Sequence, residues 1–435
     1  NIFDTHLDQL VSLTSSTLAS FMEFDSSLSA HFHITKIAEA SFSQVFLLSV
    51  PDNDKAVPTS RRHAPKPSVL KLIPLTPPSS LIPARQSKAY ANLLSLCSTP
   101  TNVASEVRLL QHLSPVPGFT NFRGLHLLRG RPGPAFCSGY KTWDTAQRRE
   151  GKERSHFPDP NRKNAYGADQ LWAVIEMQDA GSDLERLVET PAWAAFGISA
   201  VWDVFWQVVL ACGKAETASR WEHRDLHMGN ICVRLPQNST GDGGKGLQSR
   251  HDDTKTRKVG FTGLEATVID YTISRAEIHA PSGAVEVAFI DLDEDPALFE
   301  GDGDVEYQYD IYRFMRAAVF LDDPLADANT RQDEIDASGR TWRGYHPQSN
   351  VVWLHFILHQ MLENFDHRAA TIGNSEEQTR AETPVPVDLN CETILRELAA
   401  LLCLDGWRAS GLRSAGDLVA LALKRTWLNV DDVVG

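Results

Sequence analysis

The stretch from Glu222 to Asn230 reads EHRDLHMGN and is the most specific local motif in the chain. It contains His-Arg-Asp, and an asparagine follows five positions after the aspartate. In phosphoryl transfer such an aspartate orients the substrate hydroxyl and accepts its proton, and the asparagine helps to hold magnesium on the nucleotide phosphates. Asp225 and Asn230 are therefore the candidate catalytic base and metal ligand. The alternative is a helix-to-strand turn with a capping aspartate.

A second carboxylate follows the next β-rich segment. Residues 266–270 read ATVID, a run of strand-forming residues that ends in Asp270. An acid at a strand end, downstream of the first aspartate, suits a second magnesium ligand. An ordinary turn aspartate after a strand is the alternative.

A lysine lies inside a strand pattern upstream. Lys71 in VLKLI must either extend to solvent or find a partner, because strand neighbours surround it. In a nucleotide site it would neutralise phosphate charge and be held by a helix carboxylate. Glu106, on the amphipathic helix expected over 101–113, is the natural partner. An exposed strand lysine is the alternative.

Residues 32–50 alternate apolar and polar positions around a small polar middle, which predicts a hairpin of two strands. Such a hairpin would cover the phosphates, and a cover loop normally uses glycine for close backbone approach. Ala38, Ala40 and Ser43 stand where glycines are expected. Small residues keep that approach open, but the departure weakens the case for tight nucleotide binding.

The chain changes character near residue 180, from strand patterns to helical stripes such as those of 201–211 and 351–365. We therefore expect an N-terminal lobe over 1–179 and a helical C-terminal lobe over 180–435. The other expected elements are a helix over 1–30, strands over 69–73 (ended by Pro74) and 171–177, a helix opened by Gly181-Ser182-Asp183, helices in the last forty residues, and loops over 51–67, 145–168, 236–260 and 368–388.

Composition sets outer limits. The 435 residues carry 42 Lys and Arg against 56 Asp and Glu, a formal net charge of −14. This balance argues against direct nucleic-acid binding and favours a cationic partner. The longest apolar runs are short for a bilayer span, so no membrane helix is expected. Six cysteines without a CxxC pair predict no zinc site and a reducing compartment. The first residue is Asn1, so we expect a fragment of a longer protein.

Four blocks in this order resemble the haspin family of divergent histone-threonine kinases. They are EHRDLHMGN, VIDYTISR, DEDPALFEGDGDVEYQYDIYRFM and GYHPQSNVVWLHFIL. The resemblance runs from about residue 34 to the C-terminus. It implies an α+β, two-lobed protein-kinase-like fold with an antiparallel-sheet small lobe and a mostly helical large lobe. It also implies ATP and Mg²⁺ as cofactors.

The resemblance assigns a role to each matching residue. Lys71 and Glu106 would form the small-lobe ion pair, Asp225 would be the catalytic base, and Asn230 and Asp270 the metal ligands. Asp310 would anchor the catalytic-loop backbone. The nucleotide would also contact Ile37 and Val45 of the hairpin, the gatekeeper Ile175, the hinge residues Glu176, Met177 and Gln178, and Asp183 near the ribose or substrate.

The sequence departs from ordinary kinases at two places, and both departures resemble this family. Asp270-Tyr271-Thr272 replaces Asp-Phe-Gly, and Ala280-Pro281 is followed by Ser282 rather than by glutamate. The expectation is constitutive activity without phosphorylation of the activation loop. The glycine-poor hairpin, by contrast, departs from the family itself.

Residues 291–310 contain nine acids and no lysine or arginine. A solvated loop is the simple interpretation. So many like charges are nevertheless costly without a cation, and an Arg/Lys-rich peptide would be attracted there. By resemblance, Asp293, Glu294 and Asp295 would grip basic side chains beside the target threonine, and His227 and Asp183 would also contact the substrate.

The leading hypothesis is thus a serine/threonine kinase that phosphorylates a threonine in a histone tail during mitosis. It would act as a monomer in the nucleus, associated with chromosomes. Two alternatives stay open: a pseudokinase scaffold that binds a basic partner, favoured by the glycine-poor hairpin, and a small-molecule phosphotransferase on a kinase-like fold.

Overall fold

A computed structural model describes residues 2–51, 67–236, 258–279, 283–373 and 389–434. Its contacts group the chain into two compact units. Unit 1 comprises residues 1–114 and 120–179, and unit 2 comprises residues 115–119 and 180–435. The loops expected over 51–67 and 236–260 fall almost wholly outside the described residues, as do Ala280-Pro281-Ser282 and most of the loop expected over 368–388.

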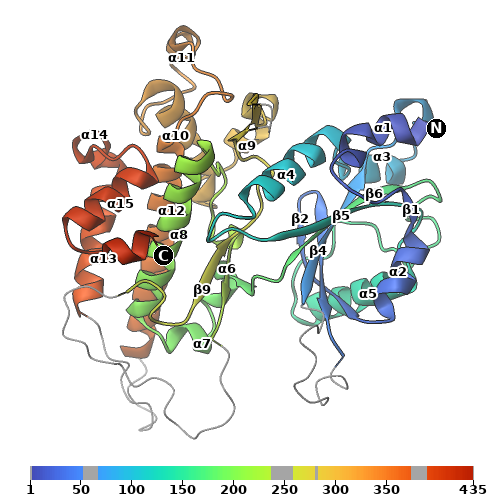
Figure 1. Ribbon diagram of the computed structural model, residues 1–435, viewed down its shortest axis with the longest axis horizontal. Helices are drawn as coiled ribbons and strands as arrows, with labels where there is room; N and C mark the ends of the chain where they lie inside the picture. The colour runs from blue at the N-terminus through green and yellow to red at the C-terminus, as the bar shows by residue number, and fades with distance from the viewer. Residues whose placement is uncertain (1, 52–66, 237–257, 280–282, 374–388, 435) are drawn as a thin grey trace, which may run out of the picture. The chain divides into compact units, whose positions relative to one another are not determined.

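Unit 1 is built around a six-stranded sheet with the strand order β1-β5-β6-β4-β3-β2 (Figure 1). Every neighbouring pair is antiparallel except β1 with β5. This is the antiparallel sheet expected for the small lobe. The strands are β1 (Ala19–Ser20), β2 (His33–Ala40), β3 (Ser43–Ser49), β4 (Ser68–Leu75), β5 (Phe122–Arg129) and β6 (Leu171–Gln178).

The hairpin expected over 32–50 is confirmed as β2 and β3, but β4 continues through Pro74. The Pro74 carbonyl accepts a hydrogen bond from the Ser98 N–H at 2.9 Å. The nitrogen and oxygen of a strand residue point to the same side, so the nitrogen of Pro74 faces away from β6. On that side β3 has already ended, at the pair of Gln44 with Leu72. The proline therefore costs no ladder hydrogen bond, and the prediction that it ends the strand is wrong.

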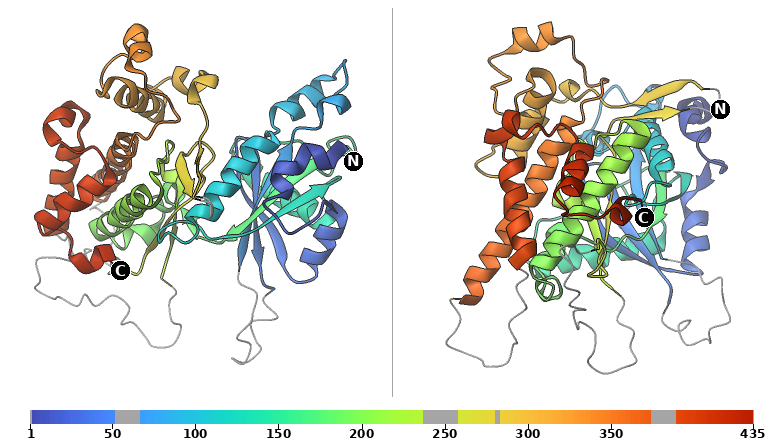
Figure 2. Two further views of the ribbon diagram at one scale, coloured as in Figure 1. Left: turned by 45° about the horizontal axis from the view of Figure 1, so that its top comes forward. Right: turned by 60° about the vertical axis from the view of Figure 1, so that its left-hand side comes forward.

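Helices cover both faces of this sheet. Figures 1 and 2 show α1 and α4 on one side of the sheet and α2 and α5 on the other. The core on the second side includes Phe21, Phe46, Phe136 and Trp172. The helices of unit 1 are α1 (Ile2–Val11), α2 (Phe21–Ser29), the short 3-10 turn η2 (Ser79–Leu81), α3 (Lys88–Ser95), α4 (Pro100–Leu113) and α5 (Pro134–Arg149). Helix α4 confirms the prediction for 101–113.

The single helix expected over 1–30 is wrong, because two helices flank an extended segment. Thr14 donates its hydroxyl hydrogen to the Leu125 carbonyl at 2.7 Å and accepts from the Ser16 N–H at 3.0 Å. Side-chain bonds of this kind compete with the helix ladder. The chain then runs beside β5 as β1 before α2 begins.

The loop expected over 145–168 is also partly wrong, because α5 extends to Arg149. This helix starts with Pro134, and its first N–H groups are capped from a distance. The Asp25 carboxylate accepts from the N–H groups of Ala135 at 3.0 Å and Phe136 at 3.2 Å. Burial raises the pKa of Asp25, and these two backbone hydrogen bonds oppose the rise.

Unit 2 is mostly helical, as expected. Its two longest helices contain the stripes predicted at 201–211 and 351–365, and α8 packs against α12, α13 and α15. The helices are α6 (Leu184–Leu187), α7 (Pro191–Ala194), α8 (Ile198–Ser219), α9 (Ala297–Glu300), α10 (Gln308–Leu321), α11 (Gln332–Ser338), α12 (Gln348–Gly373), α13 (Leu389–Leu402), α14 (Trp407–Ser410), α15 (Ala415–Lys424) and α16 (Val430–Val434), with 3-10 turns η3 (Met228–Asn230), η4 (Leu292–Glu294) and η5 (Leu404–Gly406).

Helix α8 is long and apolar enough to cross a membrane by length and composition alone, although no membrane helix is expected from its apolar runs. However, 78% of its most apolar window is buried inside the protein. Core helices of globular proteins commonly meet the same criterion, because a helix that is apolar all round packs in a core as readily as in a bilayer.

Five short strands of unit 2 carry the loops of the candidate site. One sheet has the order β7-β8-β9 and a second pairs β10 with β11. They are β7 (Ser182–Asp183), β8 (Ile231–Arg234), β9 (Glu265–Val268), β10 (Ala276–His279) and β11 (Val285–Ala288). The helix expected from Gly181 starts instead at Leu184, because Gly181 precedes β7 and Asp183 is the N-cap of α6.

Candidate active site

Lys71 and Glu106 form a buried ion pair in unit 1. Lys71 lies on β4 in the interior of the sheet, and Glu106 lies on the buried face of α4. The distance from Lys71 Nζ to Glu106 Oε1 is 2.7 Å, and 10% and 6% of the two side chains are exposed. Lys71 is therefore a paired, buried lysine and not an exposed strand lysine.

The residues around Lys71 form a row across one face of the sheet. Lys71 is directly opposite Val45 on β3 and Ile175 on β6, and Val45 is opposite Ala38 on β2. Cross-strand partners point to the same face of a sheet. Ile37 lies at the register shift between Lys36 and Ala38 and is half-buried. The sheet thus brings Val45 and the predicted gatekeeper Ile175 to the face that carries Lys71.

The predicted hinge residues occupy the end of β6. Glu176 accepts a hydrogen bond from the Ser68 hydroxyl at 2.6 Å and lies 3.5 Å from His126 Nε2. The His126 contact, helped by Ser68, lowers the pKa of Glu176 although burial opposes this. Gln178 accepts from the Asn121 amide at 2.7 Å. Met177 pairs with Val69 of β4, so all three residues are fixed by the sheet.

In unit 2, the loop over residues 222–230 brings Asp225 and Asn230 together. The Asn230 side-chain amide donates to the Asp225 carbonyl at 2.8 Å and to Asp225 Oδ2 at 3.2 Å. The 3-10 turn η3 produces this approach by folding the chain back over the four intervening residues. Because the amide nitrogen faces Asp225, the amide oxygen is the atom of Asn230 suited to a cation.

Asp270 follows β9 and lies beside the same loop. The Ile269 N–H donates to the Asn230 carbonyl at 3.0 Å, which joins the two segments. Asp270 has a φ of 58°, a left-handed conformation that aspartate tolerates better than most residues. Its Oδ1 accepts from the Thr272 hydroxyl at 2.6 Å. The three predicted residues of unit 2 therefore converge.

Burial raises the pKa of Asp225, and the negative charge of Asp270 acts in the same direction. His227, Tyr312 and Asn230 oppose the rise. His227 lies close, with Nε2 3.9 Å from Asp225 Oδ2, while its Nδ1 accepts from the Gly229 N–H at 3.1 Å. The carboxylate thus has the mixed surroundings of a group that can hold or release a proton.

The backbone before Asp225 is held by a sealed ion pair. Arg224 Nε lies 3.1 Å from Glu222 Oε2, and neither side chain is exposed. Arg224 also donates to the Trp342 carbonyl at 2.6 Å. Glu222 accepts from the His346 N–H at 2.7 Å and the Ser349 hydroxyl at 3.0 Å. Burial lowers the pKa of Arg224, but the Glu222 charge opposes this.

His223 is neutral at physiological pH, because burial lowers its pKa to about 4. Its Nδ1 accepts from the Asp225 N–H at 3.2 Å. Its Nε2 lies 3.1 Å from the Ile269 carbonyl, so the hydrogen-bond pattern assigns the ring proton to Nε2. The imidazole therefore links the Asp225 backbone to the segment that carries Asp270.

The anchor role inferred for Asp310 is wrong. Its carboxylate pairs with Arg313 in its own helix α10. The backbone of the loop over 222–230 is held instead by Asn350 at the start of α12, whose Oδ1 accepts from the His223 N–H at 3.0 Å. The Asn350 amide donates to Glu216 Oε1 at 2.9 Å and the Trp221 carbonyl at 3.1 Å. An amide serves here because it bonds both a donor and acceptors.

Sequence reasoning missed Tyr312. This residue of α10 donates its hydroxyl hydrogen to Asp225 Oδ1 and accepts from the Gln308 amide at 3.1 Å. Only 5% of Tyr312 is exposed, and its ring meets Trp353 edge-to-face with centroids 5.1 Å apart. No local pattern marks this tyrosine, since the contact spans 87 residues.

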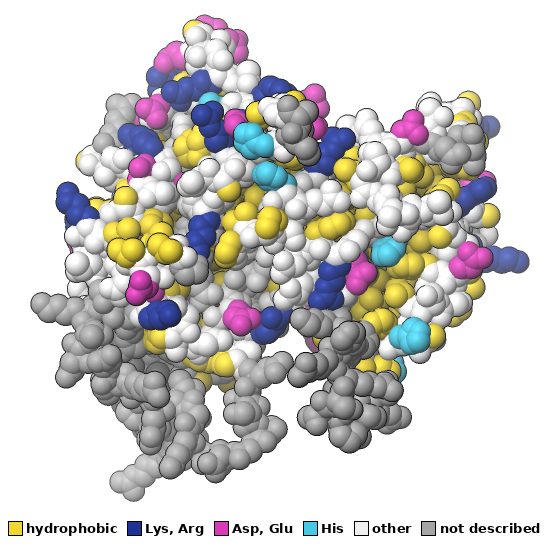
Figure 3. All heavy atoms as spheres, viewed as in Figure 1, with side chains coloured by type: hydrophobic (Ala, Val, Ile, Leu, Met, Phe, Trp, Pro, Cys, Tyr) yellow, Lys and Arg dark blue, Asp and Glu magenta, His cyan; other side chains and the backbone are white. Residues whose placement is uncertain are grey.

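The acidic segment surrounds η4 and the start of α10. Asp293, Glu294 and Asp295 are exposed, and Asp293 lies 3.2 Å from Arg316 Nε. Together with Arg313, this arginine offsets part of the negative charge from α10. On the face in Figure 3, acidic and basic side chains are interspersed.

Asp183 lies at a different point of unit 2, on β7 opposite Cys232 of β8. Its carboxylate caps α6 by accepting from the Arg186 N–H at 2.9 Å, and it lies 3.6 Å from Arg186 Nε. Capping is therefore its observed local role.

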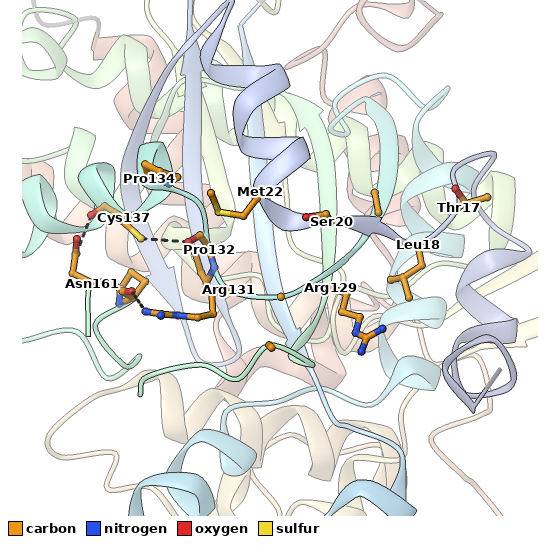
Figure 4. A pocket seen from close by; sticks show the side chains of 14 residues that line it. Thr17, Leu18, Ser20, Met22, Arg129, Arg131, Pro132, Pro134, Cys137 and Asn161 are labelled. Atoms are coloured by element: carbon orange, nitrogen blue, oxygen red, sulfur yellow. Dashed lines mark hydrogen bonds between the residues drawn. The ribbon is translucent and has the colours of Figure 1, made fainter. Parts of the chain in front are cut away.

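A separate hollow lies at the β1 edge of unit 1 (Figure 4). Its volume is about 1010 Å³, and its lining includes Ser20, Met22, Arg129, Arg131 and Cys137. None of the predicted site residues lines it. The sheet order puts this edge at the opposite end from the hairpin.

A paired lysine in an antiparallel sheet, with a helical unit whose loop gathers an aspartate, an asparagine and a following aspartate, defines a protein-kinase-like domain. The sequence matches the family model described as "Haspin like kinase domain" over residues 4–383. The chain belongs to this family.

Three curated relatives are similar over most of the chain. A serine/threonine-protein kinase haspin homolog of Drosophila melanogaster is 26% identical over 345 residues, 77% of this chain and 49% of the relative. The homolog hrk1 of Schizosaccharomyces pombe is 29% identical over 346 residues, with shares of 76% and 55%. Haspin of Mus musculus is 26% identical over 348 residues, with shares of 79% and 38%. The chain thus spans about half or less of these relatives.

Proposed function

We propose that this chain is an ATP-dependent serine/threonine protein kinase that phosphorylates a threonine in a basic histone tail. The observation that carries the proposal is the convergence on Asp225. Asn230 and Tyr312 hydrogen-bond its carboxylate, and Asp270 lies beside the same loop. This arrangement suits a base that orients a hydroxyl for attack on a phosphoryl group. The protein kinase names of the curated relatives support the same activity.

Each unit would supply different groups. Lys71, held by Glu106, would offset phosphate charge, while Val45 and Ile175 on the same face of the sheet would enclose the nucleotide together with Ile37. Glu176, Met177 and Gln178 would hold the adenine. Asp225 would orient the threonine hydroxyl and take its proton. Positioning and charge stabilisation would supply most of the rate.

The donor set of unit 2 fits magnesium. Among the described residues, no group of three or more His, Cys, Asp or Glu could hold a metal alone. Magnesium commonly takes only one or two protein ligands and completes its shell with phosphate and water. The Asn230 amide oxygen and the Asp270 carboxylate would be such ligands. The ion would neutralise the phosphate charge that develops during transfer.

The acidic segment suits a basic peptide. Glu294 and Asp295 are exposed, and Asp293 already pairs with a guanidinium, that of Arg316. Exposed carboxylates attract Arg/Lys-rich chains and form charge-assisted hydrogen bonds with them. His227, beside Asp225, and Asp183 would add substrate contacts. A histone tail has this chemistry, and it would place the kinase in the nucleus on mitotic chromosomes.

We further propose that activity needs no phosphorylation of the activation loop. In kinases switched on by such a phosphate, an arginine must be accessible to bind it. Arg224 has no exposed side-chain surface and is bonded to Glu222 and to the Trp342 carbonyl. A phosphate could not reach it without unfolding this region.

The test is labelled phosphate transfer from ATP to core histones, with mapping of the product residue. We expect phosphothreonine in a basic tail. Failure to transfer, combined with no thermal shift at millimolar MgATP, would support the scaffold alternative, since a bound ligand stabilises the folded state. Transfer to aminoglycosides or choline in place of histones would identify a small-molecule phosphotransferase.

A further inference from the structure

Lys36 of β2 is a fully buried lysine outside the catalytic constellation. None of its side chain is exposed. Its Nζ donates to Gln44 Oε1 at 2.7 Å and to Glu39 Oε1. It also lies 4.4 Å from the ring centre of Tyr140 and 4.5 Å from that of Trp143. We call Lys36, Glu39, Gln44, Tyr140 and Trp143 the Lys36 brace.

The brace lies on the face of the hairpin opposite to the nucleotide residues. Lys36 is paired with Phe46, which belongs to the core beneath α5. Val45, the neighbour of Phe46 on β3, is paired with Lys71 of β4. Successive strand residues point to opposite faces, so Lys36 points toward α5 and away from the face of Val45 and Lys71. It cannot contact a nucleotide held on that face.

The end of the hairpin is fastened to the same side. Ser155 donates its hydroxyl hydrogen to Glu39. His156 lies 3.2 Å from Glu39 Oε2 through Nδ1 and 3.2 Å from the Ala40 carbonyl through Nε2. Helix α5 approaches β2 closely at Gly139, where a Cβ would lie 3.0 Å from the Ile34 carbonyl. The hairpin is thus tied from β2 to its tip.

The turn that these contacts fix contains no glycine. Its residues are Ala40-Ser41-Phe42-Ser43. A buried ammonium is very costly unless its hydrogen bonds and charge are satisfied. The Lys36 ammonium lies between two aromatic rings and a carboxylate, and these contacts fix the position of strand β2.

We propose that Lys36 is a positioning residue for nucleotide binding, and that the brace holds the cover hairpin in its binding conformation. This inference rests on the proposed function, because it assumes that the hairpin covers ATP. A hairpin already held in place loses less conformational entropy when the nucleotide binds. The brace therefore compensates for the missing glycines, whose backbone freedom other cover loops use for close approach.

The test compares MgATP binding and steady-state kinetics in the wild type, Lys36→Met and Lys141→Met. Lys141 is the matched control, since it follows Tyr140 on α5 but is exposed. We expect Lys36→Met to raise the Kd and the KM for ATP about tenfold while kcat changes less than about threefold. Lys141→Met should match the wild type. A purely structural role would lower the folded fraction and leave the Kd of folded molecules unchanged.

A wild type that binds no MgATP would overturn the proposed function and the inference together. A wild type that binds it, with the same Kd in folded Lys36→Met, would overturn the inference alone. If Lys36→Met does not fold, Glu39→Gln removes one charge and keeps the shape. We expect it to raise the Kd about threefold and to speed amide exchange over residues 37–43. No change in either quantity would overturn the brace.

Discussion

Lys71–Glu106 in unit 1 and Arg224–Glu222 in unit 2 are both buried ion pairs. They differ in the sequence separation of the two residues and in the exposure of their side chains. The first joins a strand to a helix across 35 residues, and 10% and 6% of its side chains are exposed. The second joins residues two positions apart, with no exposed side-chain surface. It is also bonded to a carbonyl, an N–H and a hydroxyl.

This difference separates two uses of a buried charge. The desolvation cost of a fully buried pair is offset when neighbouring hydrogen bonds satisfy its remaining polar atoms. Such a pair fixes the backbone before Asp225, and it cannot contact a ligand because none of its side-chain surface is exposed. An ammonium has three donor hydrogens and can hold a carboxylate and a phosphate oxygen together. Breaking the first pair should therefore mainly reduce activity, and breaking the second should mainly reduce stability.

The largest expected effect is on stability. Arg224→Met leaves the Glu222 carboxylate buried without its cation, which should lower the free energy of unfolding by about 3–5 kcal/mol. Urea denaturation measures this. Arg331→Met, which breaks the exposed pair with Glu334, is the control and should leave the midpoint unchanged. A loss no larger than that of the control would mean that the pair is not sealed.

Lys36 provides a third buried charge with a pH signature. Burial lowers its pKa from 10.5 to about 8, against the opposing effects of Glu39 and Asp144. Between these pH values the unfolded chain binds more protons than the folded protein, so stability rises with pH. The rise from this group is roughly 3 kcal/mol between pH 8 and 10.5. Urea denaturation should show it in the wild type and not in Lys36→Met. Equal pH dependence in both proteins would contradict the buried placement.

Glu106→Gln tests the ion pair of unit 1. The substitution keeps the size of the side chain but removes the charge that holds Lys71. We expect kcat/KM for ATP to fall roughly 10- to 100-fold, because the lysine is misplaced, and the free energy of unfolding to fall by less than in Arg224→Met, because this pair keeps some exposed surface. Steady-state kinetics and denaturation on the same preparation test both halves. A large stability loss with normal kinetics would reverse the roles of the two pairs.

Tyr312→Phe should have the smallest effect. It removes one hydrogen bond to the Asp225 carboxylate and keeps the ring against Trp353. We expect kcat to fall about tenfold with an unchanged KM for ATP. Tyr309→Phe, on the same helix, is the matched control. If kcat is unchanged, Asp225 needs no support from α10.

Much of this arrangement is predictable from sequence because it is local. The hairpin, α4, α8 and α12 follow from their periodicity. Asp225 and Asn230 meet within one short loop, and their spacing in the chain predicts this contact. Lys71 and Glu106 are far apart in the sequence. Each is a charged residue within an apolar pattern, so each can be identified from its own segment.

The parts that escaped prediction depend on distant contacts. Asp25 caps α5 from 110 residues away, so the start of that helix carries no local signal beyond a proline. Asn350 rather than Asp310 holds the catalytic loop, and Tyr312 reaches Asp225 only because α10 packs beside it. Pro74 stays in its strand because β3 has already ended, which only the register reveals.

The most direct test is phosphate transfer to a basic threonine peptide by Asp225→Asn, with the Kd for MgATP measured on the same samples. The wild type should transfer phosphate. The variant should lose about 10³-fold in kcat while its Kd for MgATP stays within about threefold, because in the proposed mechanism Asp225 acts on the hydroxyl and not on the nucleotide. Near-normal transfer by the variant, or none by a wild type that binds MgATP, would contradict the assignment of Asp225 as the catalytic base.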